Sequence, residues 1–247
     1  MKATGITEFD IVEALQQPGC SLCRIARVNE VLYIRYLLGG NAGDPNTRNC
    51  VTECGGFCRR HAWEIFRLES REWGVPMGNG LLYEDLVHAT ARKMELQLDH
   101  LRKATPGGPV RRLIARVLPK RAARGNAGNA ESNRPFASCR VCTLSEEAAL
   151  QAARVLRRLL DSVEMRQRYR SSGGLCLCHL QDIAAGDNGC RNLEFLLEDT
   201  RQRLTRLADS LHAFKQKQSW ERRDEILTED ERDAVRNCVI FFSGWEE

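Results

Sequence analysis

Four short cysteine motifs constrain this chain more than any other feature of its sequence. Two Cys-x-x-Cys pairs are each followed by a Cys-x-x-His pair that is preceded by Gly-Gly. The interval between the two pairs is 34 residues in the first copy and 33 in the second. In chain order the motif residues are Cys20, Cys23, Cys58, His61, Cys139, Cys142, Cys176 and His179. This internal repeat predicts two helical modules, each with its own four-ligand metal site.

The residue types of the repeat favour zinc. A Cys-x-x-Cys turn places two sulfurs where both can reach one ion at about 2.3 Å, and Cys-x-x-His at a helix start does the same for a sulfur and a ring nitrogen. Calcium and magnesium prefer oxygen ligands. We therefore expect two structural Cys₃His zinc sites, one formed by Cys20, Cys23, Cys58 and His61 and the other by Cys139, Cys142, Cys176 and His179. Each ion would tie the first helix of a module to its third and contribute on the order of 10 kcal/mol to folding.

Other uses of the same cysteines stay open at this point. The Cys-x-x-Cys pairs could be redox dithiols, although no thioredoxin-like βαβ pattern surrounds them. An iron–sulfur cluster could use the thiolates, with Cys54 or Cys178 as a further ligand. Cys178 also competes with Cys176 for the second zinc ion. Haem attachment requires Cys-x-x-Cys-His, and the sequence from Cys176 to His179 is one residue short of it.

Apolar residues recur at helical spacing along the chain, and no segment shows a strand pattern. The helices that this spacing predicts cover residues 8–16, 24–38, 45–54, 58–68, 81–103, 143–170, 179–185, 190–216 and 228–242. We expect Trp63 and Phe66 to lie in the core beside the first metal. The sequence thus predicts an all-α protein with a first module over 1–104, a basic helix and linker over 105–137, and a second module over 138–247.

Cysteine usage and hydropathy suggest a compartment. Eleven cysteines in a chain of 247 residues, with paired spacing, favour metal binding in a reducing environment over a disulfide framework. No run of 18 apolar residues is present, which excludes a transmembrane helix. The N-terminus lacks the apolar segment of a signal peptide. We therefore expect a cytoplasmic protein without a membrane span.

Residues 102–124 carry eight Lys and Arg side chains and no acidic one. Such a segment can contact nucleic acid or an anionic membrane, but no aromatic residues are interleaved with the charges, which favours a solvated linker helix. The formal net charge of the chain is +4, and two zinc-loaded Cys₃His sites would lower it to about +2. A general nucleic-acid binder is normally more basic.

No catalytic motif emerges from the sequence. It contains no Gly-x-Ser-x-Gly elbow, Walker loop or dinucleotide fingerprint, and only the stretch from Asp209 to His212 approaches a di-iron motif. Our leading hypothesis is a non-enzymatic structural or interaction protein with an unknown protein partner. The second is a redox- or metal-responsive regulator that uses the cysteine clusters and binds nucleic acid through residues 102–124. The third is an enzyme with its site in a helical cleft.

The two modules resemble an uncharacterised bacterial domain-of-unknown-function family of cytoplasmic helical proteins. The resemblance covers nearly the whole chain and includes Leu82 to Leu86 and the region from Trp220 to Gly244. In that family proline often precedes the histidine of the second module, whereas Cys178 stands at this position here. The resemblance implies paired metal modules in an all-helical protein and no particular reaction.

Overall fold

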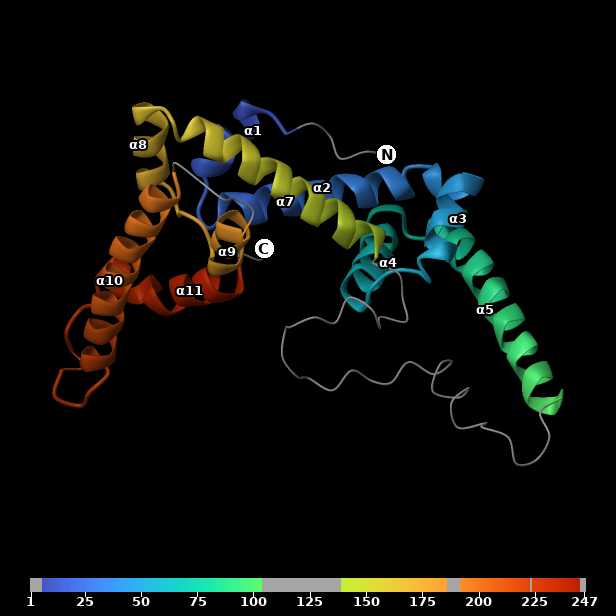
Figure 1. The fold of residues 1–247 in the computed structure, drawn as a ribbon. Coiled ribbons are helices and arrows are strands. Elements are labelled where there is room, and N and C mark those ends of the chain that lie inside the picture. Colours follow the sequence, from blue (N-terminus) through green and yellow to red (C-terminus); the bar gives the residue numbers. More distant parts are fainter. Residues whose placement is uncertain (1–5, 104–138, 186–191, 223, 245–247) are drawn as a thin grey trace. The chain divides into compact units, whose positions relative to one another are not determined.

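The computed structural model describes residues 6–103, 139–185, 192–222 and 224–244, and among these residues it contains helices and no strand (Figure 1). The all-α prediction is therefore confirmed. The elements are α1 (Glu8–Leu15), α2 (Ser21–Leu38), η1 (Asn41–Gly43), α3 (Pro45–Glu53), α4 (Arg59–Trp73), α5 (Met77–Lys103), α7 (Arg140–Leu159), α8 (Val163–Ser171), α9 (Leu177–Ala185), α10 (Leu193–Lys217) and α11 (Glu229–Ser243). None of the described helices has an apolar stretch long enough to cross a membrane.

The contacts divide the chain into two compact units. The first unit combines Met1–Glu30 with Leu144–Glu247, and the second consists of Val31–Thr143. The boundaries thus fall inside α2 and α7, not near residues 104 and 138 as we expected from the repeat. The segment 105–137, expected to be a basic helix and linker, lies outside the described residues.

The core of the first unit explains why residues 1–30 belong with the second half of the chain. Leu22 and Ile25 on α2 share one buried cluster with Leu156 and Leu160, which lie on and directly after α7, and with Tyr169 on α8. Burying one such aliphatic side chain contributes about 1.5–3 kcal/mol. Within the same unit α10 and α11 pack against one another (Figure 1).

Local capping signals set the starts of several helices. Thr7 and Thr228 each form a capping box with the acidic residue three positions later, at the starts of α1 and α11. Asp44 caps α3 by accepting from the backbone N–H of Thr47, and Pro45 occupies the first helical turn. The Asp-Pro start of α3 and the Thr-x-x-Glu start of α11 are both readable from the sequence. Side-chain caps of this kind are worth about 1 kcal/mol each.

The single helix expected over 143–170 is two helices, α7 and α8. Asn192 explains the break, because its Nδ2 donates to the carbonyl oxygen of Arg157 at 2.8 Å and to Oδ1 of Asp161 at 3.0 Å. Arg166 donates through Nε to the carbonyl oxygen of Leu160 at 2.7 Å. Backbone acceptors at the end of α7 are thereby satisfied by one side chain far away in the sequence, Asn192, and by one on the next helix, Arg166.

In the second unit α4 and α5 pack against one another, and α3 and η1 pack against α5. The buried side chains of α4 are His61, Ile65 and Glu69, which follow one another at intervals of four residues. Trp63 and Phe66 lie off this face and are 57% and 42% exposed. Our expectation that these two aromatic residues belong to the core is therefore wrong.

Candidate metal centres

The first cluster joins residues from the two ends of the first unit. Cys20 lies directly before α2 and Cys23 in its first turn, while Cys176 lies directly before α9 and His179 in its first turn. Nδ1 of His179 is 3.4 Å from Sγ of Cys20, 3.4 Å from Sγ of Cys23 and 3.3 Å from Sγ of Cys176. The sulfurs of Cys23 and Cys176 are 3.7 Å apart.

The second cluster has the same form and lies within the second unit. Cys58 is the N-cap of α4 and His61 lies in its first turn, whereas Cys139 and Cys142 flank the start of α7. Nδ1 of His61 is 3.3 Å from Sγ of Cys58, 3.5 Å from Sγ of Cys139 and 3.3 Å from Sγ of Cys142. The Cys58 and Cys142 sulfurs are 3.7 Å apart.

These spacings fit a tetrahedral ion. Bonds of about 2.3 Å to sulfur and about 2.0–2.1 Å to nitrogen, at tetrahedral angles, place two sulfurs about 3.8 Å apart and a sulfur and a nitrogen about 3.5 Å apart. In each cluster the four ligand atoms lie within 4.8 Å of one another. Both clusters therefore have the residue types and the spacing of a closed Cys₃His site.

The structure gathers all eight motif residues, but it pairs them differently from our expectation. Cys20 and Cys23 do not meet Cys58 and His61; they meet the Cys-x-x-His pair of the other copy of the repeat. The pairing of ligands within each copy is therefore wrong. The start of α2 packs in the core of the first unit, and this packing places its cysteine pair next to Cys176 and His179.

Glycines at matching positions deliver the two Cys-x-x-His pairs. Gly56 has φ +98° and Gly174 has φ +74°, both two residues before the cysteine. Residues other than glycine rarely adopt a backbone φ in this left-handed region. The turn allows Cys58 and Cys176 to start a helix with the histidine in its first turn. All four pairs thus stand at helix N-termini, where the helix dipole favours thiolates.

A comparison with protein families gives a match over residues 1–247. The chain belongs to DUF6062, a family of unknown function. Neither the curated proteins nor the solved structures contain a match to it. What this DUF6062 member does must therefore be argued from its own residues.

The electrostatics of the first cluster correspond to a His179 imidazolium held by the Cys176 thiolate when no metal is bound. Burial lowers the pKa of His179, but hydrogen bonds with Cys176 and Cys23 outweigh it and raise the pKa to about 10. Hydrogen bonds from Cys20 and Cys23, together with the imidazole, hold the pKa of Cys176 far below its ordinary value. The pKa of Cys20 is raised, chiefly because its proton is shared with Cys176. A cation at the centre would replace these shared protons.

In the second cluster, too, the pKa values of the cysteines are shifted in opposite directions. Burial raises the pKa of Cys139, but the hydrogen bond with His61 and backbone N–H groups outweighs it and lowers the pKa to about 6. Burial and the neighbouring Cys139 thiolate raise the pKa of Cys142 well above its ordinary value. One thiolate thus forms readily here even without a metal ion.

The remaining cysteines of the described residues stand outside both clusters. Cys178, which competed with Cys176 in the sequence, is exposed and belongs to neither cluster. Cys50, Cys54 and Cys238 are half-buried and also belong to neither one. Cys190 lies outside the described residues. The expectation that Cys176 accompanies His179 therefore agrees with the structure, and no further cysteine of the described residues joins a cluster.

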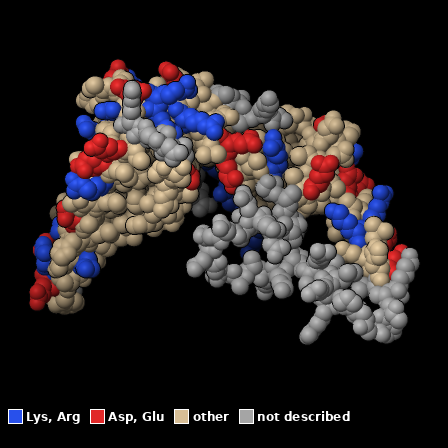
Figure 2. Space-filling view, in the orientation of Figure 1, with Lys and Arg blue, Asp and Glu red and all other residues tan. Residues whose placement is uncertain are grey.

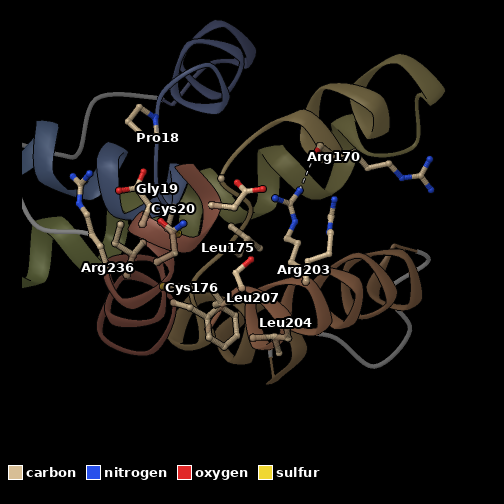
Figure 3. A pocket seen from close by; sticks show the side chains of 18 residues that line it. Pro18, Gly19, Cys20, Arg170, Leu175, Cys176, Arg203, Leu204, Leu207 and Arg236 are labelled. Atoms are coloured by element: carbon tan, nitrogen blue, oxygen red, sulfur yellow. Dashed lines mark hydrogen bonds between the residues drawn. The ribbon is translucent and has the colours of Figure 1, made fainter. Parts of the chain in front are cut away.

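A cavity of about 440 Å³ adjoins the first cluster, and Cys20 and Cys176 form part of its wall (Figure 3). In this view Arg236 lies on one side of these two cysteines and Arg203 on the other. Arg203 is held in place, since its Nη1 donates to the carbonyl oxygen of Ser172 at 2.6 Å and its Nη2 to that of Tyr169 at 2.8 Å. A molecule in this cavity would touch the edge of the candidate metal centre.

Proposed function

We propose that this chain binds two zinc ions, one in each Cys₃His cluster, and that the ions are structural. The first would be held by Cys20, Cys23, Cys176 and His179, and the second by Cys58, His61, Cys139 and Cys142. The observation that carries the proposal is the agreement between the measured S···S and S···N spacings and those of a tetrahedral ion. Three thiolates and one imidazole are soft and borderline ligands, which suit zinc.

The geometry supports a structural and not a catalytic role for the ions. Each cluster offers four protein ligands, so no coordination position is left for water or substrate. Each also joins segments that are distant in sequence, 153 residues apart for Cys23 and Cys176 and 84 for Cys58 and Cys142. An ion at such a crossing would contribute on the order of 10 kcal/mol of apparent free energy to folding.

We propose further that the protein acts by binding another protein. Several large apolar side chains of the second unit are half or more exposed, among them Trp63, Trp73, Val75 and Met77. Exposed apolar surface of this kind marks interaction sites when it gathers on one part of a protein. Along α10, in contrast, basic and acidic groups alternate in the view of Figure 2, and Arg201 pairs there with Glu198 at 2.7 Å. A surface on which both charge signs alternate is typical of a solvent-exposed face.

Metal content tests the proposal. The full chain, purified without added metal, should contain two zinc ions per molecule by mass spectrometry, with about five free thiols in the folded state because six of its eleven cysteines bind zinc. Chelation should unfold both units. Iron with a visible absorption band, or fewer than five thiols without zinc, would contradict the zinc proposal and favour an iron–sulfur cluster or disulfides.

One observation favours a second candidate, a redox-responsive release of the ion from the second cluster. The pKa of Cys139 is lowered to about 6, so its thiolate is the group that peroxide attacks. Cys54, whose pKa is raised by burial and by Cys50 and Cys139, is a neighbouring spare thiol. Hydrogen peroxide would oxidise two thiols to a disulfide and be reduced to water. If this candidate is right, peroxide releases zinc from the second cluster first, and Cys54→Ser slows that release. Equal release from both clusters would contradict it.

Two further proposals rest on the chemistry of the sequence. Six thiolate ligands require reduced cysteines, which supports a cytoplasmic location.

Nucleic-acid contact through residues 102–124 falls almost wholly on residues outside the described part of the chain. Its test is a salt-dependent affinity for DNA or RNA that falls in Arg111→Ala/Arg112→Ala.

A further inference from the structure

The cavity of about 440 Å³ beside the first cluster has side chains of both charge signs in its lining, and every lining residue belongs to the first unit. α10 contributes Arg203 and Arg206 and no acidic residue, whereas α11 contributes Asp230, Asp233 and Arg236. The two helices pack against one another. Opposite charges therefore line one cavity from two neighbouring helices.

Helical spacing places the polar lining residues on one face of each helix. Intervals of three and four residues bring side chains to the same side of a helix. On α10 this face carries two basic groups and a hydroxyl, and on α11 it carries two acidic groups and an amide. The residues are Arg203, Arg206 and Ser210 on α10, and Asp230, Asp233 and Asn237 on α11.

Three of these charges are not paired within the protein. Among the described residues, the side chains of Arg206, Asp230 and Asp233 form no ion pair and no hydrogen bond. Arg206 and Asp230 are exposed and Asp233 is half-buried, so all three are accessible to a ligand. Charges of opposite sign that line a cavity without touching one another suit a molecule that carries both an anionic and a cationic group.

The other arginines of the lining have partners or lie elsewhere. Arg203 pairs with Asp199, and the guanidinium of Arg170 lies over the ring of Phe195, 5.2 Å from its centroid. Arg236 and Arg203 lie at opposite sides of the cavity in Figure 3. A ligand with a negative charge alone would therefore meet one unpaired arginine of α10 and two unpaired aspartates of α11, which disfavours a simple anion.

The same cavity also has an apolar part. Leu204 and Leu207 on α10 and Ile240 and Phe241 on α11 belong to its lining. Ligand cavities of about 300–1,000 Å³ hold drug-sized molecules, and a single amino acid is smaller than these. The volume and the lining thus suit a larger molecule with an apolar body.

We propose that this cavity binds a short peptide with apolar side chains and free termini. The terminal carboxylate pairs with Arg206, and the terminal ammonium lies between Asp230 and Asp233. Ser210 and Asn237, whose side chains have no hydrogen bond among the described residues, bind the peptide group as donors and acceptors. The apolar side chains of the peptide contact the leucine, isoleucine and phenylalanine side chains of the lining.

The site adjoins the candidate metal centre, because Cys20 and Cys176 form part of the cavity wall. Loss of the proposed ion would therefore disturb the cavity. The zinc content of each sample is measured together with peptide binding, which separates a failure of this proposal from a failure of the zinc proposal.

The experiment measures, by calorimetry on the full chain, the binding of Leu-Leu, its N-acetyl form, its C-terminal amide and the doubly blocked form. Acetylation removes the ammonium and amidation removes the carboxylate, while the apolar body stays the same. Leu-Leu should bind at least about fivefold more tightly than either singly blocked form, as expected for hydrogen bonds to charged groups. Free leucine is a fifth probe and should bind more weakly than Leu-Leu.

Two variants assign the ends of the peptide. Arg206→Gln should weaken the binding of Leu-Leu about fivefold and leave that of its amide unchanged. Asp230→Asn combined with Asp233→Asn should weaken the binding of Leu-Leu by a similar factor and leave that of the N-acetyl form unchanged. The matched controls are Arg201→Gln and Asp209→Asn, which change exposed residues of α10 outside the lining and should keep all affinities.

Leu-Leu that binds no more tightly than its doubly blocked form, or that shows no binding at about 1 mM, would overturn the proposal. Lining variants that weaken the binding of all four peptides equally would also overturn it, because the charges would then not recognise the termini. Leucine that binds as tightly as Leu-Leu would contradict the assignment of a peptide.

Discussion

Sγ of Cys23 lies 3.7 Å from Sγ of Cys176, although 153 positions separate the two residues in the sequence. The contact closes the first unit, whose parts come from the two ends of the chain. The Cys-x-x-His pair of the first copy, Cys58 and His61, therefore combines with the Cys-x-x-Cys pair of the second copy, and Cys58 contacts Cys142. This crossed pairing and pairing within each copy of the repeat predict different zinc contents for the same double variants.

Double substitutions should reveal the crossed pairing. Cys23→Ser and Cys176→Ser each remove one ligand of the same proposed ion, so each alone should lower the zinc content from two to about one per chain. Combined, they should still leave about one. Cys23→Ser combined with Cys58→Ser should leave close to none, because these residues serve different ions. Native mass spectrometry measures all four variants.

The matched control for these variants is Cys178→Ser, since Cys178 is exposed and belongs to neither cluster. It should keep both ions. If the combination of Cys23 and Cys58 left one ion and that of Cys23 and Cys176 left none, the ligands would be paired within each copy, and the crossed arrangement would be wrong.

Gly173→Ala should weaken the first unit. A Cβ at position 173 would lie 2.5 Å from the carbonyl oxygen and 2.7 Å from the nitrogen of Gly19, and backbone atoms cannot move aside as a flexible side chain can. Overpacking of this kind costs roughly 1–3 kcal/mol. Because Gly19 precedes Cys20, the zinc affinity of the first cluster should fall as well. Urea unfolding and chelator competition measure the two effects.

The comparison variant is Gly43→Ala in η1, where an added Cβ meets nothing within 4 Å. Its urea midpoint should stay close to that of the parent chain. An equal loss of stability in both variants would mean that the Gly19–Gly173 contact is not the cause.

Arg203→Lys should destabilise the first unit by about 1–3 kcal/mol despite keeping the charge. Arg203 donates through Nε to Oδ2 of Asp199 at 2.5 Å and through its two Nη groups to carbonyl oxygens of Ser172, Tyr169 and Arg170. Lysine has no planar fork of donors and leaves several of these acceptors unpaired. Thermal unfolding followed by circular dichroism measures the change.

For contrast, Arg201→Lys alters an exposed pair, with side chains of Arg201 and Glu198 67% and 50% accessible. Surface pairs of this kind contribute little, so its unfolding temperature should not change measurably. If Arg203→Lys behaved in the same way, the network around Arg203 would carry no stability.

Zinc binding to the first cluster should release protons. In the metal-free cluster the pKa of His179 is raised to about 10, above the ordinary histidine value of about 6.5. The stabilisation that the protonated ring gives to the metal-free fold is therefore complete below about pH 6.5 and is lost as the pH rises through about 10. Zinc needs a neutral imidazole and thiolates, so its apparent affinity should rise between pH 7 and pH 9.

Calorimetry in buffers of different ionisation enthalpy counts the protons released. At pH 7 the count should include the proton of His179, and the affinity should rise about tenfold per pH unit for each proton released. His179→Cys provides a variant without the imidazole proton. Binding heats that do not depend on the buffer would contradict the imidazolium–thiolate state of the metal-free cluster.

Much of the local structure follows from the sequence because its causes are local. The capping box at Thr228 and the Asp44–Pro45 helix start are signals within four residues of the helix that they begin. The Gly-Gly turn before Cys58 likewise sets the local geometry of one Cys-x-x-His pair. Distant residues decide the other features. The break between α7 and α8 depends on Asn192, which is 31 residues away from Asp161.

By itself the sequence determined that the protein is all-helical and that eight cysteine and histidine residues stand in four pairs, because helical periodicity and pair spacing are properties of neighbouring residues. The tertiary structure alone decided which pairs meet. Any Cys-x-x-Cys turn can combine with any Cys-x-x-His turn at one ion, so spacing along the chain cannot choose between them. The choice follows from burial, since Leu22 and Ile25 pack with Leu156 and Tyr169 in one core and bring Cys23 to Cys176.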